Sequence, residues 1–312
     1  MARFDLEAVL PELGLPQRDL HNHPSSGRTF PDGGHYRFEV SGVEDRVALE
    51  AMLDEAQKRG VTIHRIIGSV QGAALLTKPD LREFAELAHD AGVEVVMPPF
   101  PSRAWDTGRV IATTEGYMSG IRIRGADNFA SVLRDIARCL EAGIRGFLVV
   151  DEGLLVTLDA LRKRGTIPPE TGFKFSVYAG HANPAAMKLL EQLGATTVNP
   201  LPDLSLAMLA AIRQVIGVPM DVYVSCIESW GGIHRFHEAA EIVRLCSPCY
   251  LKIEPGRSEM DHYKPWLTPD FRCFWVRQKV KYAAILQELL EDAGAAFKVS
   301  SPGAPDLRIP KP

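Results

Sequence analysis

The sequence predicts a (β/α)8 barrel, also called a TIM barrel, preceded by an N-terminal extension. From Tyr36 onward, short apolar runs alternate with longer helical patterns, and there are eight of each. This alternation is typical of a parallel sheet with helical crossovers, and the 312 residues somewhat exceed the ~250 residues of a typical closed barrel. A doubly wound open sheet is the alternative. No G-x-G-x-x-G motif follows the first strand, so the usual cofactor motif of that fold is missing.

The eight predicted strands are short runs of apolar residues bounded by turn residues. They are 36–41, 61–67, 93–97, 144–150, 173–178, 196–199, 220–225 and 250–254. The helices that follow them are predicted at 45–59, 79–91, 128–142, 154–164, 184–193, 205–216, 233–245 and 276–293. Four of these helices lead into the next strand through a glycine, at Gly60, Gly92, Gly143 and Gly194, as expected for left-handed helix C-caps.

Segments at both ends of the chain and one long connection lie outside the repeat. Residues 1–34 form the N-terminal extension, residues 35–300 form the barrel, and residues 301–312 form a C-terminal tail. A long connection, 98–127, follows the third strand on the face where barrels place their catalytic loops. We therefore expect the functional loops at the carboxyl ends of the strands.

The composition favours small-molecule chemistry. The 35 Lys and Arg residues are balanced by 39 Asp and Glu residues, so no basic surplus supports nucleic-acid binding. No apolar run approaches the roughly 20 residues of a membrane span, and acidic residues stand where a signal peptide would be basic and apolar. We expect a soluble, cytoplasmic protein. Its five cysteines are an odd set, and the C-x-x-C at Cys246 and Cys249 has no second pair, which favours packing thiols over a metal or redox site.

Polar residues alternate along three predicted strands. Lys174, Ser176 and Tyr178 share one face of the fifth strand, Tyr223 and Ser225 share one face of the seventh, and Lys252 and Glu254 share one face of the eighth. Inward-facing residues of barrel strands can reach a substrate at the mouth. Further polar residues on or after the other strands are Arg37, Glu39, Arg65, Asp151 and Asn199. We predict an ionic barrel mouth. A structural network of buried ion pairs is the alternative.

The candidate catalytic residues are Lys252, Asp151, Glu39, Glu254 and Tyr178. A lysine with a lowered pKa can form a Schiff base, and Lys252 and Lys174 are both eligible. The alternative is a salt bridge from Lys252 to Glu39 or Asp151. The three carboxylates could instead bind Mg²⁺, so a divalent cation is the candidate cofactor.

Arginines and glycines in the predicted loops indicate an anionic substrate group. Guanidinium groups hold carboxylate or phosphate in a bidentate manner, and glycines at a helix start leave N–H groups for a phosphate. The candidate substrate-binding residues are Arg65, Arg103, Arg124, Ser176, Asn199, Tyr223, Gly231 and Gly232. Surface arginines and an ordinary glycine helix start explain the same residues.

The extension contains a pair of histidines, His21 and His23, in a spacing similar to the H-x-H of metal-dependent amidohydrolases. In those enzymes the motif ends the first barrel strand. Here it precedes Pro24 and the predicted first strand, so a pair of loop histidines is favoured over a metal site.

Residues 174–224 carry a pattern that resembles the barrel of the U32 peptidase-like family. The matching residues are Ser176, Asn183-Pro184-Ala185, Leu193-Gly194-Ala195, Asp203-Leu204-Ser205-Leu206, Ala211-Ile212-Arg213 and Asp221-Val222-Tyr223-Val224. The family includes collagenase-like proteases and iron–sulfur proteins that support RNA or quinone hydroxylation. The resemblance implies a U32-like barrel. The cysteines at 226, 246, 249 and 273 do not reproduce the spacing of the family's iron–sulfur members, and we transfer no peptidase activity.

Together these observations predict an enzyme that acts on a small, anionic, polar metabolite by acid–base chemistry, as a lyase, an isomerase or a hydrolase. One alternative is a non-catalytic barrel that binds a ligand or a partner protein. Another is a metal or iron–sulfur protein of the U32 type. The expected partner is the small-molecule substrate, with no nucleic acid and no membrane, and a homo-oligomer is left open.

Overall fold

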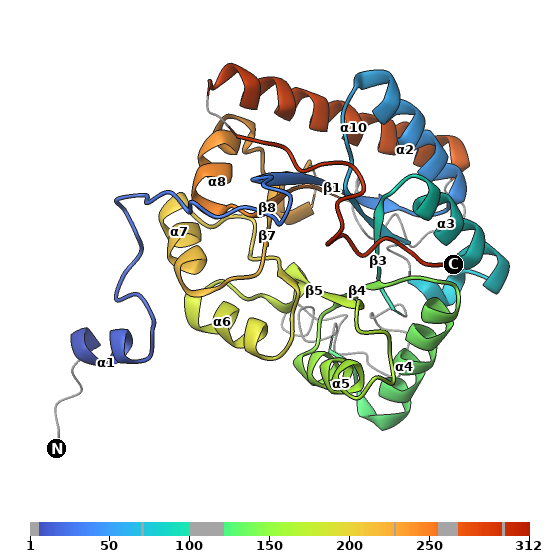
Figure 1. Ribbon diagram of the computed structural model, residues 1–312, viewed down its shortest axis with the longest axis horizontal. Helices are drawn as coiled ribbons and strands as arrows, with labels where there is room; N and C mark the ends of the chain where they lie inside the picture. Colours follow the sequence, from blue (N-terminus) through green and yellow to red (C-terminus); the bar gives the residue numbers. More distant parts are fainter. Residues whose placement is uncertain (1–5, 70–71, 100–121, 228, 255–267, 295–296) are drawn as a thin grey trace.

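The computed structural model describes residues 6–69, 72–99, 122–227, 229–254, 268–294 and 297–312. Its eight strands form a closed barrel in the order β1 to β8, and every neighbouring pair is parallel. Helices surround the barrel (Figure 1). The predicted (β/α)8 fold is confirmed.

Each predicted strand coincides with an observed one, although most observed strands are shorter. The strands are β1 Tyr36–Val43, β2 Arg65–Gly68, β3 Glu94–Met97, β4 Gly146–Val149, β5 Gly172–Phe175, β6 Thr197–Val198, β7 Met220–Ser225 and β8 Cys249–Ile253. The largest differences are at β2, which begins four residues later than predicted, and at β5, which ends at Phe175. The chain there turns into a 3-10 helix, η4 Val177–Ala179, whose N-cap is Ser176.

The eight described helices that surround the barrel are α2 Arg46–Arg59, α3 Lys78–Asp90, α4 Gly125–Glu141, α5 Glu152–Lys163, α6 Pro184–Gln192, α7 Leu206–Val215, α8 Ala239–Cys246 and α10 Pro269–Asp292. Six of them begin at polar caps whose side chains accept from N–H groups of the first turn, and α4 and α8 begin without such a cap. Side chains of Asp45, Thr77, Asn183 and Ser205, for example, accept hydrogen bonds from backbone N–H groups. The four glycines predicted at helix ends all have positive φ, between 63° and 107°.

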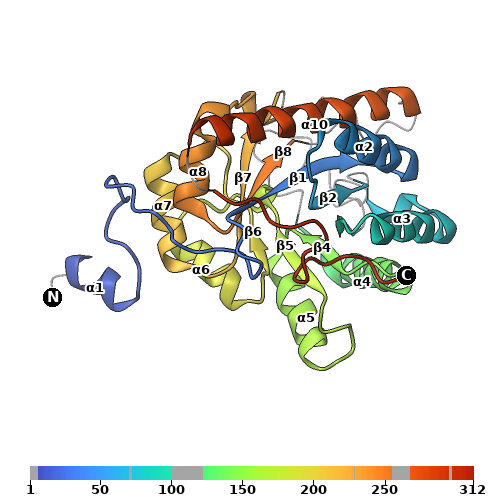
Figure 2. The same ribbon diagram turned by 45° about the horizontal axis from the view of Figure 1, so that its top comes forward.

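Two helix predictions are wrong at one end. The predicted helix 233–245 starts six residues later, at Ala239, because a short 3-10 helix, η6 Phe236–Glu238, occupies its first turns and His234 pairs with Ser225 in a β-bridge. The predicted helix 276–293 starts earlier, at Pro269, where Thr268 provides the N-cap. The latter helix packs along α2, as Figure 2 shows.

The main apolar core lies between the barrel and its helices. Phe38 and Ile66 point outward from β1 and β2 and pack in one cluster with Leu49, Met52 and other helix residues. The interior of the barrel is different, because charged side chains fill its central level. This division follows the strand alternation, with apolar residues facing the helices and polar residues facing inward.

In the described residues of the N-terminal extension there is one helix, α1 Leu6–Glu12, which stands away from the barrel (Figures 1 and 2). The Nζ atom of Lys188 on α6 donates a hydrogen bond to the carbonyl of Leu13 at 2.8 Å. Further along, the Leu20 and Ser26 N–H groups donate to carbonyls of α7 and α8 at 3.2 and 2.9 Å. The extension therefore docks on the sides of α6, α7 and α8.

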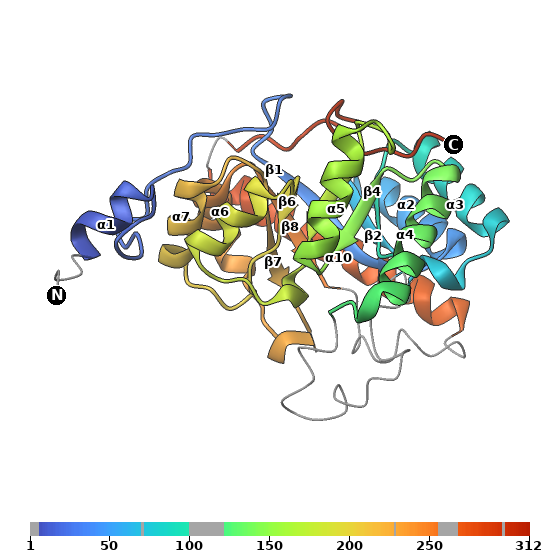
Figure 3. The ribbon, with the colours of Figure 1, turned by 90° about the horizontal axis from the view of Figure 1, so that it is seen from below.

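The C-terminal tail crosses the amino-terminal end of the barrel, on the same side as the extension (Figure 3). Asp306 pairs with Arg37 of β1 at 2.6 Å, and the Lys311 N–H group donates to the carbonyl of Gly143 at 2.7 Å. A Cβ at Gly143 would lie 2.5 Å from the Pro312 nitrogen, so only glycine allows this approach. The tail closes the end of the barrel opposite the expected catalytic face.

No helix in the described part of the chain combines the length and apolarity that a membrane span requires.

Candidate functional site

Five charged side chains meet inside the barrel, contributed by β1, β2, β5, β7 and β8. None of them is more than 4% exposed. They are Glu39, Arg65, Lys174, Asp221 and Lys252, and we call them the barrel ion cluster. Side chains from strands far apart in the sequence converge here because inward-facing positions of neighbouring strands lie at the same level. The backbone of Glu39, for instance, is in register with both Arg65 and Lys252.

The guanidinium group of Arg65 joins the two carboxylates of the cluster. Its Nε donates to Glu39 and its Nη2 donates to Asp221. Its plane lies over the ring of Tyr250, 3.3 Å from the centroid, an arrangement suited to cation–π attraction. Asp221 also accepts hydrogen bonds from Lys174 and, at 2.8 Å, from the Thr197 hydroxyl. Arg65 is therefore committed to the cluster rather than directed at the barrel mouth.

The two lysines share one carboxylate oxygen. The Nζ atom of Lys174 lies 3.3 Å from Glu39 Oε1, and the Nζ atom of Lys252 lies 3.2 Å from the same oxygen. Lys252 also donates to Asn199 Oδ1 at 3.0 Å and lies 4.7 Å from the centroid of the Tyr223 ring. The alternative predicted for Lys252, a salt bridge to Glu39, is thus present. Among the described residues Glu39 Oε1 has no hydrogen-bond partner, so this buried oxygen lies between the two amino groups as an ion-pair partner with its acceptor capacity unused.

The cluster holds three cationic side chains and two carboxylates, so one positive charge is uncompensated when both lysines are protonated. Burial lowers the pKa of Lys174 from 10.5 to about 7. The carboxylates of Asp221 and Glu39 oppose this shift, while the charges of Lys252 and Arg65 add to it. Burial by itself would raise the pKa of Glu39, but Arg65 and the two lysines outweigh it and hold that pKa below its usual range. When Lys174 loses its proton, the two remaining cations balance the two carboxylates of the cluster.

The structure places the cluster within the length of the strands, deeper than the rim at which we expected it. Arg65 is the first residue of β2, and Asp221 is the second residue of β7. The next level toward the amino-terminal end contains Arg37, Glu94 and Tyr250, with the Tyr250 hydroxyl 3.1 Å from Arg37 and 3.4 Å from Glu94. Lys252 and Asn199 form the edge of the cluster that faces the carboxyl ends of the strands.

The carboxyl ends of the strands carry other predicted residues. Ser176 and Tyr178 lie in the turn after β5, and the Tyr178 ring is 5.3 Å from that of Trp230 after β7. Tyr223 packs with Val177 beneath them in a small apolar cluster. Because the Tyr223 ring also contacts the Lys252 ammonium group, these aromatic residues connect the rim with the barrel ion cluster.

The structure gives two predicted carboxylates local backbone contacts. Asp151 is the N-cap of α5, and its Oδ1 accepts from the Leu154 N–H group at 3.0 Å. Glu254 is 2% exposed, and its Oε1 accepts from the Ile227 N–H group. The structure shows no contact between Asp151 and the barrel ion cluster. Within the described ranges, no group of three or more His, Cys, Asp and Glu side chains is arranged to hold a metal ion.

The anion-binding residues predicted in the loops are not brought together. Arg124 is the residue before α4, and Arg103 lies outside the described residues. The prediction that Gly231 and Gly232 open a helix is wrong. Gly231 is the last residue of the short 3-10 helix η5 Ser229–Gly231 and Gly232 follows it. Their φ values are positive, at 80° and 74°, and α8 begins only at Ala239. A Cβ on Gly232 would lie 2.9 Å from the Ile227 carbonyl oxygen, which accounts for the glycine there without a phosphate.

Sequence reasoning missed Asp221, which is a member of the cluster, and Thr197, whose hydroxyl donates to Asp221. Asp221 precedes Tyr223 and Ser225 at the same period of two, so the alternation that singled out those residues also includes it. Thr197 is the first residue of the two-residue strand β6, where alternation gives no signal. Four of the five cysteines are buried, and all five are free.

Comparisons with known proteins give matches among solved structures. No protein-family model matches the chain, and no curated protein does either. The YdjI aldolase from Escherichia coli K12 shares 14% identity at a TM-score of 0.46, covering 82% of this chain and 92% of its own. A U32 peptidase, Mk0906, shares 16% identity at a TM-score of 0.43, covering 74% of this chain and 98% of its own. The 4-hydroxy-tetrahydrodipicolinate synthase from Methylacidiphilum fumariolicum SolV shares 11% identity at a TM-score of 0.44, covering 87% and 93%.

The second of these structures belongs to the family that residues 174–224 resemble. At such identities and TM-scores, these matches show similarity to barrel proteins and assign no reaction.

Proposed function

We propose that the protein is a TIM-barrel enzyme that acts on a small anionic carbonyl metabolite, with Lys252 as the reacting amine. The observation that carries the proposal is the shared oxygen of Glu39, which lies within 3.3 Å of the amino groups of both Lys252 and Lys174. A lysine must lose its proton before it can attack a carbonyl carbon. The cluster offers a route for that proton.

The proton transfer follows from the charges in the cluster. Lys174, with a pKa of about 7, is partly deprotonated near neutral pH and can accept a proton. The proton of Lys252 passes through Glu39 Oε1 to the neutral Lys174 amine. Because this transfer leaves the net charge of the cluster unchanged, it adds no desolvation penalty for buried charge.

The neutral Nζ of Lys252 then attacks the carbonyl carbon of the substrate to form a carbinolamine. The proton held by Lys174 returns through Glu39 and lets the carbinolamine hydroxyl leave as water, which gives a protonated imine. That cation lies beside Glu39, which stabilises it as it stabilised the ammonium group. The imine withdraws electrons from the neighbouring carbon–carbon or carbon–hydrogen bond. Bond cleavage at that position is lyase chemistry, and proton removal and return there is isomerase chemistry.

Other residues of the predicted site have supporting roles in this proposal. Asn199 holds Lys252 at 3.0 Å, and its own side-chain amide donates to the Asp221 carbonyl at 2.7 Å, which fixes its orientation. Tyr178 and Trp230 lie at the carboxyl ends of the strands, where a substrate would enter. We propose that Tyr178 donates or accepts a proton at the substrate.

Reductive trapping tests the proposal. The protein is incubated with glyoxylate, pyruvate or dihydroxyacetone phosphate, treated with borohydride, and mapped by peptide mass spectrometry. We expect an adduct on Lys252 that is lost in Lys252→Met and strongly reduced in Lys174→Met. Lys188→Met, which removes a partly exposed lysine of α6 on the outside of the barrel, is the matched control and should retain the adduct. Labelling of surface lysines alone, or an adduct on Lys252 that does not depend on Lys174, would contradict the mechanism.

A non-catalytic barrel is the second candidate function, and one observation favours it. Both carboxylates of the barrel ion cluster are already paired with cations of the protein itself, as in a purely structural network. In that case Lys252→Met would change stability without changing any reaction with carbonyl compounds. The trapping experiment therefore separates the two candidates.

A further inference from the structure

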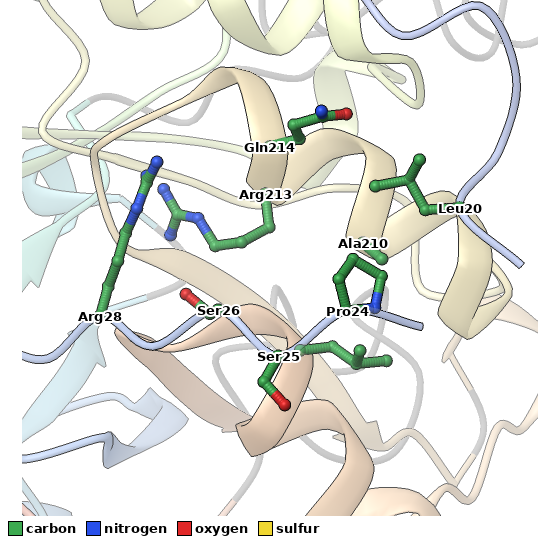
Figure 4. A pocket seen from close by; sticks show the side chains of 9 residues that line it. Leu20, Pro24, Ser25, Ser26, Arg28, Ala210, Arg213 and Gln214 are labelled. Atoms are coloured by element: carbon green, nitrogen blue, oxygen red, sulfur yellow. The ribbon is translucent and has the colours of Figure 1, made fainter. Parts of the chain in front are cut away.

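A pocket lies on the outside of the barrel, between the N-terminal extension and the helices α7 and α8. Its volume is about 250 Å³. Leu20, Ala210 and Leu245 provide apolar walls, and Ser25 and Ser26 of the extension lie along one side (Figure 4). The extension thus forms one wall of the pocket, and the barrel forms the other.

Two arginines meet at one end of this pocket. Arg213 of α7 is 3% exposed, and its guanidinium lies beside that of Arg28 from the extension (Figure 4). Both donate to the same carbonyl, that of Ile216, which follows the last residue of α7. The Nη1 atom of Arg213 is also 3.5 Å from the Cys246 carbonyl, while its Nε has no hydrogen-bond partner. A buried guanidinium therefore retains an unused donor.

The positive charges of Arg28 and Arg213 lie close together at this end of the pocket, and among the described residues neither is paired with a carboxylate. Neither Arg28 nor Arg213 forms a salt bridge with the residues that the structure describes. Burial, and then the neighbouring charge of Arg28, lower the pKa of Arg213 to about 10. Glu191 opposes this shift, but its Oε1 accepts hydrogen bonds from the Gly217 and Val218 N–H groups at 2.8 and 3.0 Å. Two adjacent cations thus share a site that an anion would complete.

We propose that this pocket binds a small organic anion, with a carboxylate or phosphate group between Arg28 and Arg213. The apolar walls would accept a short hydrocarbon body. The Ser25 hydroxyl accepts a hydrogen bond from Arg244 at 3.0 Å and keeps its own hydrogen for the anion, whereas the Ser26 hydroxyl already donates to the Ser247 carbonyl. The anionic group would receive the free donor of Arg213 and the remaining donors of Arg28. Guanidinium pairs recognise both carboxylates and phosphates in this way.

The pocket is separate from the site proposed for catalysis. It lies at the carboxyl end of α7 and beside the end of α8, and these helix ends adjoin the amino-terminal side of the barrel. Lys252 instead faces the carboxyl ends of the strands. Since the ligand would contact both the extension and the barrel, binding is expected to hold the extension in its docked position.

Isothermal titration of the full chain tests the proposal with three probes, inorganic phosphate, benzoate and the uncharged benzamide. We expect saturable binding of at least one of the two anions and none of benzamide. Binding of both anions would show that any oxyanion fits, while binding of benzoate alone or phosphate alone would identify the head group. Lack of saturable binding by both anions would overturn the proposal.

Variants distinguish a built site from general attraction to positive charge. Arg28→Ala removes an exposed side chain and should weaken anion binding about tenfold. Arg18→Ala makes the same charge change elsewhere in the extension, outside the pocket lining, and should leave binding unchanged. Equal losses in the two variants, or no loss in Arg28→Ala, would contradict the proposal. Lys252→Met should bind the anion normally, so this test does not depend on the proposed enzymatic function.

Discussion

The pKa of Lys174 has a consequence for stability that can be measured without knowing the substrate. The free lysine titrates at 10.5, whereas Lys174 in the folded protein titrates at about 7. Between these two values the unfolded chain binds the proton and the folded protein does not. Stability therefore rises with pH across this window, by about 1.4 kcal/mol per pH unit for one fully shifted group. Below pH 7 both states are protonated, and this contribution no longer changes with pH.

The perturbation that isolates this effect is Lys174→Met. Methionine fills a similar volume and does not titrate. The pH dependence of the difference in unfolding free energy between wild type and variant therefore reports the titration of Lys174. From pH 7.5 to pH 9 we expect that difference to move in favour of the wild type by about 2 kcal/mol. Urea unfolding at several pH values, with constant ionic strength, measures it.

Two further variants serve as controls for this measurement. Lys163→Met removes a lysine that is 72% exposed and serves as the control for the loss of a surface lysine. Lys279→Met removes another buried lysine whose pKa burial lowers to about 7, and should give a slope similar to that of Lys174→Met. A flat profile for Lys174→Met would show that Lys174 keeps its proton throughout this range, and the proposed proton acceptor would be lost.

Other predictions concern the charge balance and the tail. Glu39→Gln leaves three cations facing one carboxylate, so we expect a loss of about 3–5 kcal/mol in unfolding free energy at pH 7. Lys174→Met leaves two cations and two carboxylates in the cluster, so it should lower the unfolding free energy clearly less. Equal losses for the two variants in urea unfolding would refute this charge count. Asp306→Asn removes the carboxylate that pairs with the buried Arg37 and should cost about 1–3 kcal/mol. It should also speed hydrogen exchange at the Ser300 and Lys311 amides, and unchanged exchange there would show that the tail is held by other contacts.

Most of the architecture could be predicted from the sequence, because it depends on local patterns. Strand runs and helix periods repeat eight times, and glycines such as Gly60 and Gly194 mark the helix ends. The start of α8 could not be predicted. Residues 233–238 have a helical pattern, but His234 is drawn into a bridge with Ser225, so a tertiary contact overrides local preference.

The candidate site was only partly predictable for the same reason. The alternation of polar and apolar residues correctly predicts that Lys174 and Lys252 face into the barrel. Closure of the barrel pairs β8 with β1 and so brings Lys252 beside Glu39. The alternation could not show the depth of the cluster, because the stagger of neighbouring strands is a property of the whole barrel. Asp151 follows β4 as expected but caps α5, since a carboxylate at that position satisfies free N–H groups of the helix. Nothing in residues 297–312 indicated that they cross the barrel.

The protonation state of Lys174 can be observed directly by NMR. Lysine labelled with ¹³C at Cε is incorporated, the Lys174 resonance is assigned by its loss in Lys174→Met, and its chemical shift is followed from pH 5.5 to pH 10. We expect a transition near pH 7, together with a smaller response of the Lys252 resonance at the same pH through their common neighbour Glu39. A Lys174 transition near 10, or a Lys252 resonance that does not respond, would contradict the shared-proton arrangement on which the proposed chemistry depends.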